Sequence, residues 1–345
     1  MADPIRVGMI RCDTHGAYYA PLMDRHDPLL LRNPMPLDQP AQASWQTGGA
    51  HYYHYMNYAD PRRMTADFVG GFEIVKLWDQ RRELAEMLSK VLYGRPAVCD
   101  HFAQVSDDVD LVFIADCNGD GSDHLELAAP GLKKGVATFI DKPLAYTVAH
   151  LEALLDLAAQ HRAPLYSMSI LGALPQTLQF RSRLAEVGEL QFGSIQGGGT
   201  AMAGHVHALV LALAVFGGGV QRVFSTGPNP LDLIHLDYGN QPHRPVAGVT
   251  ITCNVGSVWH CAFHCTASGP MGAILSSPLN DFVFPFGAAQ ILRQLPDLVR
   301  TGHPPADFSL MVEAVCIAEA ARTAHTAAGG VALDQNAVQQ LLRPR

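Results

Sequence analysis

The stretch LVFIADCNGDGSDHLELAAPGLKKGVATFIDKPLA, residues 111–145, decides the fold. Its first five residues are apolar and suit a buried strand, a polar loop follows, and His124 to Lys134 predicts a helix. Val136 to Ile140 is a second strand-like run that ends at Asp141-Lys142-Pro143. Strand, helix and strand at this spacing are typical of a parallel, doubly wound sheet.

The same alternation continues on both sides of this stretch. Further strands are expected at Ile5–Ile10, Phe72–Trp78 and Pro164–Ile170, and helices from Gly16, over Arg81–Leu92 and over Leu151–His161. Residues 27–71 are rich in Pro, Gly, His and Tyr and show no clear period. We therefore expect an α/β protein whose first domain, residues 1–145, is Rossmann-like and carries an insertion at 27–71.

The pattern changes in the second expected domain, residues 146–345. Strands now follow one another closely, which predicts an α+β domain with a mostly antiparallel sheet. The expected strands are Leu190–Gln196, Val220–Ser225, Val246–Val255, Val258–Ala267 and Val331–Leu333, and the expected helices are Pro175–Val187, His207–Phe216 and Phe308–Ala327. A sheet of this kind with one exposed face usually pairs, so a homodimer or homotetramer is expected.

Composition narrows the class of protein. Of 345 residues only 16% are charged and the net charge is −8, which argues against binding to nucleic acid or to an anionic membrane surface. The longest apolar stretch, Ala208 to Phe216, is too short to cross a bilayer. Seven cysteines without a C-x-x-C pair indicate reduced thiols. We expect a soluble, cytoplasmic protein that acts on a small molecule.

Two motifs carry a family resemblance. The first is KKGVATFIDKPLA, residues 133–145, and the second consists of Gly198-Gly199, Ala203, His207 and Gly217 at fixed spacing. In this order they resemble the glucose–fructose oxidoreductase / inositol dehydrogenase (Gfo/Idh/MocA) family, whose Glu-Lys-Pro signature reads Asp141-Lys142-Pro143 here. The resemblance covers roughly residues 5 to 334.

The resemblance implies NAD(P)-dependent hydride transfer on a sugar, inositol or related polyol. It gives Lys142 and His207 the catalytic roles, because a histidine can take a hydroxyl proton near neutral pH while a lysine polarises the oxygen. It also places cofactor binding at Arg11, Asp13, Gly16 and Asp79. The plainer alternative is that Lys142 caps a strand end and His207 begins a helix.

The sequence departs from the family at the residues that should hold the cofactor. The G-x-G-x-x-G turn of such proteins reads Arg11, Asp13 and Gly16 at its three glycine positions, and an aspartate at a helix N-terminus repels phosphate. Asp79 ends the second strand, where ribose hydroxyls are bound, but it lies far beyond the usual spacing. Ala203 replaces the family aspartate that precedes the histidine.

These departures leave a second hypothesis open: a cofactor-free or divalent-metal-assisted lyase, epimerase or hydrolase acting on a carbohydrate. A metal site would draw on Asp13, His15 and His205, since many carboxylates and histidines fall at the expected strand ends. His205 can join His207 only if it precedes the helix. For Asp116, Asp120 and Asp123 an ordinary loop and helix-cap role is the alternative. A non-catalytic sugar-binding protein is a third hypothesis.

A loop inside the insertion is a candidate for substrate contact. Residues 49–58 read GAHYYHYMNY, and aromatic rings stack on sugars while imidazole and phenol groups bond to hydroxyls. The alternative is a loop that packs on itself and covers apolar surface. The expected substrate residues are His51, Tyr52, His54 and Tyr55, together with His205.

Overall fold

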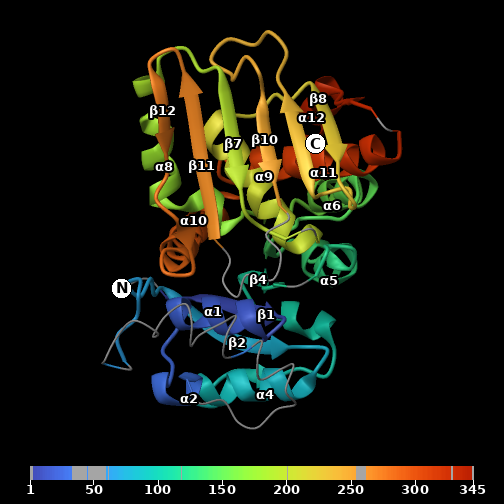
Figure 1. Ribbon diagram of the computed structural model, residues 1–345. Helices are drawn as coiled ribbons and strands as arrows, with labels where there is room; N and C mark the ends of the chain where they lie inside the picture. Colours follow the sequence, from blue (N-terminus) through green and yellow to red (C-terminus); the bar gives the residue numbers. More distant parts are fainter. Residues whose placement is uncertain are drawn as a thin grey trace.

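The computed structural model describes residues 3–32, 45, 60, 62–117, 119–199, 201–253, 262–327 and 329–343. It forms two lobes, each built on its own sheet (Figure 1). The smaller sheet has six strands and belongs to the N-terminal lobe, and the larger one has eight strands and belongs to the C-terminal lobe. The predicted α/β class and the Rossmann-like first lobe are confirmed.

The six-stranded sheet is parallel throughout and has the order β3-β2-β1-β4-β5-β6. Its strands β4 and β5 are entirely buried, because helices cover both faces, and this explains why they read as unbroken apolar runs. The strands are β1 (Ile5–Ile10), β2 (Phe72–Trp78), β3 (Ala97–Val98), β4 (Leu111–Ile114), β5 (Ala137–Ile140) and β6 (Leu165–Tyr166).

The strand order places the ligand side of this lobe. From β1 the chain adds β2 and β3 on one side, and it then adds β4, β5 and β6 on the other side, so the strand order switches between β1 and β4. Ligands of such folds bind outside the carboxyl ends of the strands at that point. The helices that follow the strands are α1 (Thr14–Met23), α4 (Arg82–Val91), α5 (His124–Lys133) and α6 (Val148–His161). All ten residues of α1 are buried, so even its polar side chains face protein rather than water.

The insertion at 27–71 is described only in part. It begins with the short helix α2 (Pro28–Arg32), and the buried indole of Trp45 donates a hydrogen bond of 3.0 Å to the carbonyl of Leu31. The residues expected to contact substrate, His51, Tyr52, His54 and Tyr55, lie outside the described part.

The larger sheet is mixed, with the order β12-β11-β7-β10-β9-β8-β14 and β13 paired to β11. Only the β7–β10 pair is parallel; the other pairs are antiparallel. Its strands are β7 (Phe192–Gln196), β8 (Arg222–Thr226), β9 (Leu233–Asp237), β10 (Val249–Thr252), β11 (Ala262–Gly269), β12 (Gly272–Leu275), β13 (Leu279–Asn280) and β14 (Val331–Ala332).

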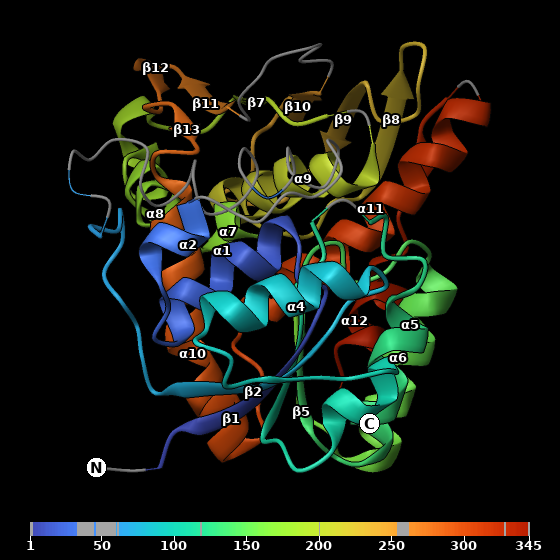
Figure 2. The same ribbon diagram turned by 90° about the horizontal axis from the view of Figure 1, so that it is seen from below.

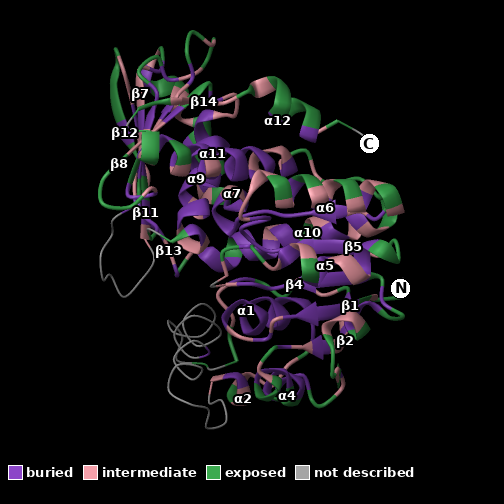
Figure 3. Cartoon of the chain, turned by 90° about the vertical axis from the view of Figure 1, so that its right-hand side faces the viewer, coloured by how far each residue is buried: buried purple, intermediate pink, exposed green. Residues whose placement is uncertain are grey.

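Helices pack on one face of this sheet, while the other face points away from the rest of the chain (Figure 3). The central helix α9 lies against the inner face (Figure 2) and is apolar all round, as a helix enclosed between layers must be. The helices of this lobe are α7 (Ile170–Ala173), α8 (Pro175–Ser182), α9 (Met202–Phe216), α10 (Phe284–Thr301), α11 (Phe308–Ala327) and α12 (Gln335–Leu341). No helix in the described ranges is long and apolar enough to cross a membrane.

Several expected boundaries are corrected by the structure. Helix α9 begins at Met202 rather than at His207, so His205 lies inside it. The strand expected at Pro164–Ile170 is only β6, because the Ser169 hydroxyl accepts from the amide of Leu171 and begins α7 there. Strands β3, β9 and β12 and helices α10 and α12 were not predicted. The domain boundary at 145 stays a prediction, although the N-terminal sheet takes β6 from beyond it.

Candidate functional site

The turn between β1 and α1 keeps the backbone shape of a glycine-rich turn. Arg11, at the first glycine position, has φ of 70°, in the left-handed region that glycine adopts most readily. A Cβ added at Gly16 would lie 2.6 Å from the Arg11 carbonyl oxygen, so the one retained glycine is required by close approach of the helix to the strand. Positive φ at Arg11 and close approach at Gly16 give this turn two features of a glycine-rich turn without its first two glycines.

The side chain of Arg11 spans the ligand side of the sheet. Its guanidinium forms an ion pair with Asp123, which precedes α5, and a longer hydrogen bond of 3.4 Å with the amide oxygen of Gln80, which follows β2. Arg11 therefore ties the loops after β1, β2 and β4 together. Its charge is thus partly offset by Asp123.

Asp13, at the second glycine position, presents a carboxylate in the same turn. One of its oxygens is buried and has no hydrogen-bond partner among the described residues. Burial, and next the nearby Asp79, raise the pKa of Asp13 to about 6. Asp79 accepts hydrogen bonds from the amides of Cys12 (2.7 Å) and Arg81 (2.8 Å), so both of its oxygens already hold the turn. Arg11, Asp13, Gly16 and Asp79 thus lie together at this turn, and their role in cofactor binding stays a prediction.

A second group forms where β5 ends. Asp141 accepts a hydrogen bond of 2.8 Å from the amide of Lys142 through one oxygen and pairs with Nδ1 of His15 through the other. Asp141 and His15, on the first turn of α1, are both buried. Burial alone would lower the pKa of His15, but Cys117 and Asp141 outweigh it and raise that pKa to about 10.

Lys142 joins the two lobes. Its side chain is only 2% exposed, and its ammonium donates to the carbonyl of Cys117 in the N-terminal lobe (2.6 Å) and to that of Ala203 on α9 (3.1 Å). An ammonium has three donors, so one N–H remains for another acceptor. The position where the family carries an aspartate thus contributes a backbone carbonyl here.

His207 lies one helical turn after Ala203, on the same face of α9. Its Nδ1 forms a hydrogen bond of 2.7 Å with the Ser169 hydroxyl. Burial, then Lys142 and His15, hold the pKa of His207 well below its usual range, so the ring is neutral at physiological pH. The structure therefore brings Lys142, His207 and His15 together.

His205 does not join this group. Two residues apart on a helix, His205 and His207 point about 200° apart, and the expectation that His205 precedes the helix is wrong. The ring of His205 is fully buried, and neither of its nitrogens has a hydrogen-bond partner in the described part of the chain. Burial, and next Arg322, lower its pKa to about 3. Its predicted roles in substrate or metal binding have no support from this position.

The described residues bring a different set of possible metal ligands together: atoms of Asp116, Asp123 and His124 lie within 4.8 Å of one another. Each is already engaged. His124 Nε2 bonds to Asp116 (3.1 Å), Asp116 also accepts from the amide of Gly119 (3.0 Å), and Asp123 pairs with Arg11. Burial raises the pKa of Asp116, but the bond to His124 outweighs it and holds that pKa below its usual range. We assign no metal to this loop.

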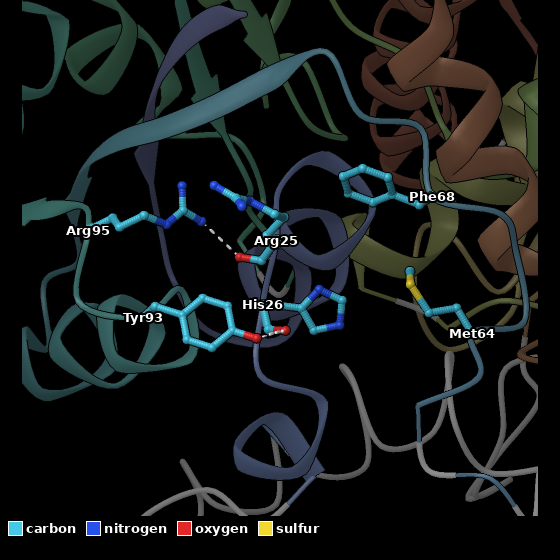
Figure 4. Close-up of a pocket in the computed structure, with 6 residues that line it drawn as sticks. All are labelled: Arg25, His26, Met64, Phe68, Tyr93 and Arg95. Atoms are coloured by element: carbon cyan, nitrogen blue, oxygen red, sulfur yellow. Dashed lines mark hydrogen bonds between the residues drawn. The ribbon is translucent and has the colours of Figure 1, made fainter.

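A pocket of about 620 Å³ lies elsewhere, past the end of α1 (Figure 4). Several of its polar groups already form ion pairs or hydrogen bonds with neighbouring groups. Arg95 pairs with Asp24 and donates to the carbonyl of Arg25, and the Tyr93 hydroxyl donates to the carbonyl of His26. The lining residues are Arg25, His26, Met64, Phe68, Tyr93 and Arg95. None of the catalytic candidates lines it, so we do not connect it with the chemistry.

Sequence reasoning missed two members of the site. Ser169, which orients His207, was read as part of a strand, and Cys117, whose carbonyl holds Lys142, was counted only among the cysteines. The position of Cys117 directly after a strand and an aspartate was a usable signal, because such positions line the ligand side of a parallel sheet.

The fold defines the class: two-lobed proteins with a Rossmann-type sheet, in which Lys142 of the first lobe contacts the helix that carries His207 in the second. The family model described as "Oxidoreductase family, NAD-binding Rossmann fold", of the Gfo/Idh/MocA type, matches residues 47–168. Over that segment the chain is similar to the Gfo/Idh/MocA oxidoreductases. The matched segment contains Lys142 but begins after the β1–α1 turn.

Solved structures extend the similarity of fold to nearly the whole chain. GenD2 from gentamicin A biosynthesis, in complex with NAD, has a TM-score of 0.70 at 14% identity and covers 97% of both chains. A myo-inositol dehydrogenase from Corynebacterium glutamicum has 0.68 at 14%, covering 96% of this chain and 99% of its own. An oxidoreductase from Agrobacterium radiobacter with NAD+, L-tartaric acid and magnesium has 0.63 at 14%, covering 96% and 98%. No curated protein matches in sequence.

The family binds NAD, but the β1–α1 turn of this chain does not fit a dinucleotide in that manner. A pyrophosphate over the turn would meet the carboxylate of Asp13, and the Arg11 guanidinium of the same turn is paired with Asp123. Two like charges about 4 Å apart at an effective dielectric near 20 repel by about 4 kcal/mol. We therefore derive no step that passes through the cofactor.

The buried carboxylate of Asp13 has a measurable effect on stability. Because its pKa is raised to about 6, the folded state binds a proton more tightly than the unfolded state, and stability falls as pH rises from about 4 to 6. Asp13→Asn removes this cost, and we expect the variant to gain about 2 kcal/mol more at pH 8 than at pH 4. Urea unfolding at both pH values measures it, with the exposed Asp3→Asn as control. A variant less stable than the natural protein at pH 8 would show that the carboxylate is favourably bonded.

Proposed function

We propose that the chain is an enzyme acting at a hydroxyl-bearing carbon of a sugar, inositol or related polyol, with Lys142 and His207 as its catalytic pair. The observation that carries this proposal is the convergence of the two residues: the Lys142 ammonium bonds to the helical turn that carries His207. The family match and the inositol dehydrogenases among the similar structures support the substrate class.

The pair suits the removal of a hydroxyl proton. When the Ser169 oxygen accepts from Nδ1–H of His207, Nε2 carries a lone pair, and the neutral ring can take the substrate proton. The remaining N–H of Lys142 can donate to the same substrate oxygen and stabilise the charge that develops on it. Dehydrogenation needs the removal of this hydroxyl proton, whereas elimination and epimerisation next to a carbonyl need the removal of a carbon-bound proton, for which a neutral imidazole can also be the base.

Two reaction classes could use this pair of residues. NAD(P)-dependent dehydrogenation is supported by the family and by the NAD complexes of similar structures, and NAD(P) would supply the hydride acceptor. Proton-transfer chemistry without a dinucleotide, as in a lyase, epimerase or hydrolase, is favoured by one observation, the Asp13 carboxylate in the phosphate-binding turn. The first class has the support of the family match, and the second rests on the poor fit of this turn to a pyrophosphate.

Loss of either catalytic side chain tests the proposal. We expect Lys142→Ala and His207→Ala to lower kcat by about 100-fold or more without unfolding the protein. Turnover of a panel of inositols, aldoses and alditols measures it, with and without NAD or NADP. Lys134→Ala and His264→Ala, at surface positions, are the matched controls. Unchanged turnover in both catalytic variants contradicts the assignment.

Dinucleotide binding separates the two reaction classes. We expect NAD and NADP to bind the natural protein with Kd above about 1 mM, and Asp13→Gly to tighten binding at least tenfold, since it removes both charge and volume. Asp13→Asn removes the charge but keeps the volume, and so tells the two causes apart. Isothermal titration calorimetry measures the Kd of NAD and of NADP for the natural protein and for both variants. Micromolar binding by the natural protein would establish the dehydrogenase reaction instead.

We propose that the chain forms a homodimer or homotetramer through the outer face of the larger sheet. One row across this face, Leu275–Thr266–Ser194–Thr250–His235–Phe224, is uncharged, and its hydroxyls bond within the row. Exposed Leu233 and Leu275 add apolar surface. Analytical ultracentrifugation at micromolar concentration should show an oligomer that Leu233→Glu weakens. A monomeric natural protein contradicts the proposal.

A cytoplasmic location remains a proposal as well.

A further inference from the structure

A cavity of about 410 Å³ opens at the amino edge of the parallel sheet. Its lining includes Pro164 and Leu165 at the start of β6, whereas Lys142 follows the carboxyl end of the neighbouring parallel strand β5. The end of α6, the segment between α10 and α11, and the end of α12 complete the lining. The cavity is therefore separate from the candidate catalytic site, and its volume lies in the range of small-molecule sites, about 300–1,000 Å³.

The walls of this cavity are mostly hydrocarbon. They include Leu155 and Ala159 of α6, Phe308 at the start of α11, and Leu341 and Leu342 at the end of α12. Neighbouring side chains bury Phe308 and Leu341, but Leu155, Ala159 and Leu342 are only half-buried. Apolar surface left facing water in this way favours a ligand with a hydrocarbon body.

Three basic side chains line the same cavity: Arg162, His303 and Arg343. Among the described residues no aspartate or glutamate lines it. All three basic residues are exposed, and within the described ranges their side chains form no hydrogen bond or ion pair. A chain with a net charge of −8 thus presents two unpaired guanidiniums and an imidazole around one apolar cavity.

The ends of the neighbouring helices do not use up these cations. Helices α6, α10 and α12 all end at the cavity, and a helix C-terminus carries only about half a negative charge. Backbone amides already bond to the terminal carbonyls: the amide of Arg162 donates to Ala158 and Ala159. In the same way, the amide of Gly302 donates to the carbonyl of Leu298. The guanidiniums therefore stay available to a ligand.

The backbone of Arg162 gives an independent indication. Its φ of 53° lies in the left-handed region, where a helix most often ends in glycine. An arginine is strained there relative to glycine, and it brings a guanidinium to the cavity.

We propose that this cavity binds a small monocarboxylate with a hydrocarbon body, such as a medium-chain fatty acid. A guanidinium holds a carboxylate through two parallel N–H···O bonds, and the apolar walls take the hydrocarbon out of water. A sugar or an inorganic phosphate would leave the walls facing polar groups, and an uncharged hydrocarbon would leave the guanidiniums unused. The site does not depend on the polyol chemistry proposed above, so its test needs no activity assay.

Titration calorimetry with octanoate and with 1-octanol tests the charge and the hydrocarbon separately. We expect octanoate to bind with Kd below about 1 mM and at least about tenfold more tightly than 1-octanol, because only octanoate carries a carboxylate. Replacing both arginines, Arg162→Gln with Arg343→Gln, should remove this difference and leave octanol binding unchanged. Arg300→Gln is the matched control, because this exposed arginine of α10 pairs with Asp297 and does not line the cavity.

The location is tested by filling the cavity and by hydrogen exchange. Ala159→Phe should abolish binding of both probes, and octanoate should slow amide exchange in α12 but not in α4, on the far side of β1 and β2. The proposal is overturned if octanoate binds no more tightly than 1-octanol, if the double arginine variant keeps the affinity of the natural protein, or if the slowed amides lie outside the cavity. Should Ala159→Phe fail to fold, the arginine variants, whose changes are at exposed positions, still decide.

Discussion

The buried ammonium of Lys142 is the interaction on which the site depends. A charged group taken out of water must recover its hydrogen bonds inside the protein, and Lys142 does so with one carbonyl from each lobe. The loop after β4 and the first turn of α9 are thereby held at a fixed separation. His207 is carried by that same helix, so its distance from the N-terminal lobe is set by the lysine.

Much of the fold could be predicted because its physical causes are local. Strands buried on both faces, such as β4 and β5, must be apolar throughout. The half-buried strand β2 and helix α11 were also predicted with the bounds that the structure has. Helix α10 was missed because Pro285, Gly287 and Pro296 disrupt its pattern, although Pro285 lies in the first turn and Gly287 allows close approach to Ile170. Helix α12 is short and largely polar, so its periodicity carries little signal.

The site was predictable in its residues and not in its pairings. Lys142 and His207 follow from motif spacing, and Asp13 from a broken glycine pattern. That Asp141 turns toward His15 rather than toward solvent, or that Arg11 reaches Asp123, depends on side-chain packing between segments more than a hundred residues apart. His205 shows the opposite failure: the residue was noticed, but its direction depended on where a helix begins.

One oxygen atom of Ser169 takes part in two hydrogen bonds. Its hydroxyl accepts from the amide of Leu171, which begins α7, and the same atom bonds to Nδ1 of His207. A substitution of Ser169 that changes the orientation of His207 therefore also changes the hydrogen bond at the start of α7. Under the function proposed above, substitutions of Ser169 would be selected against twice, once through the abundance of folded protein and once through the activity of each folded molecule.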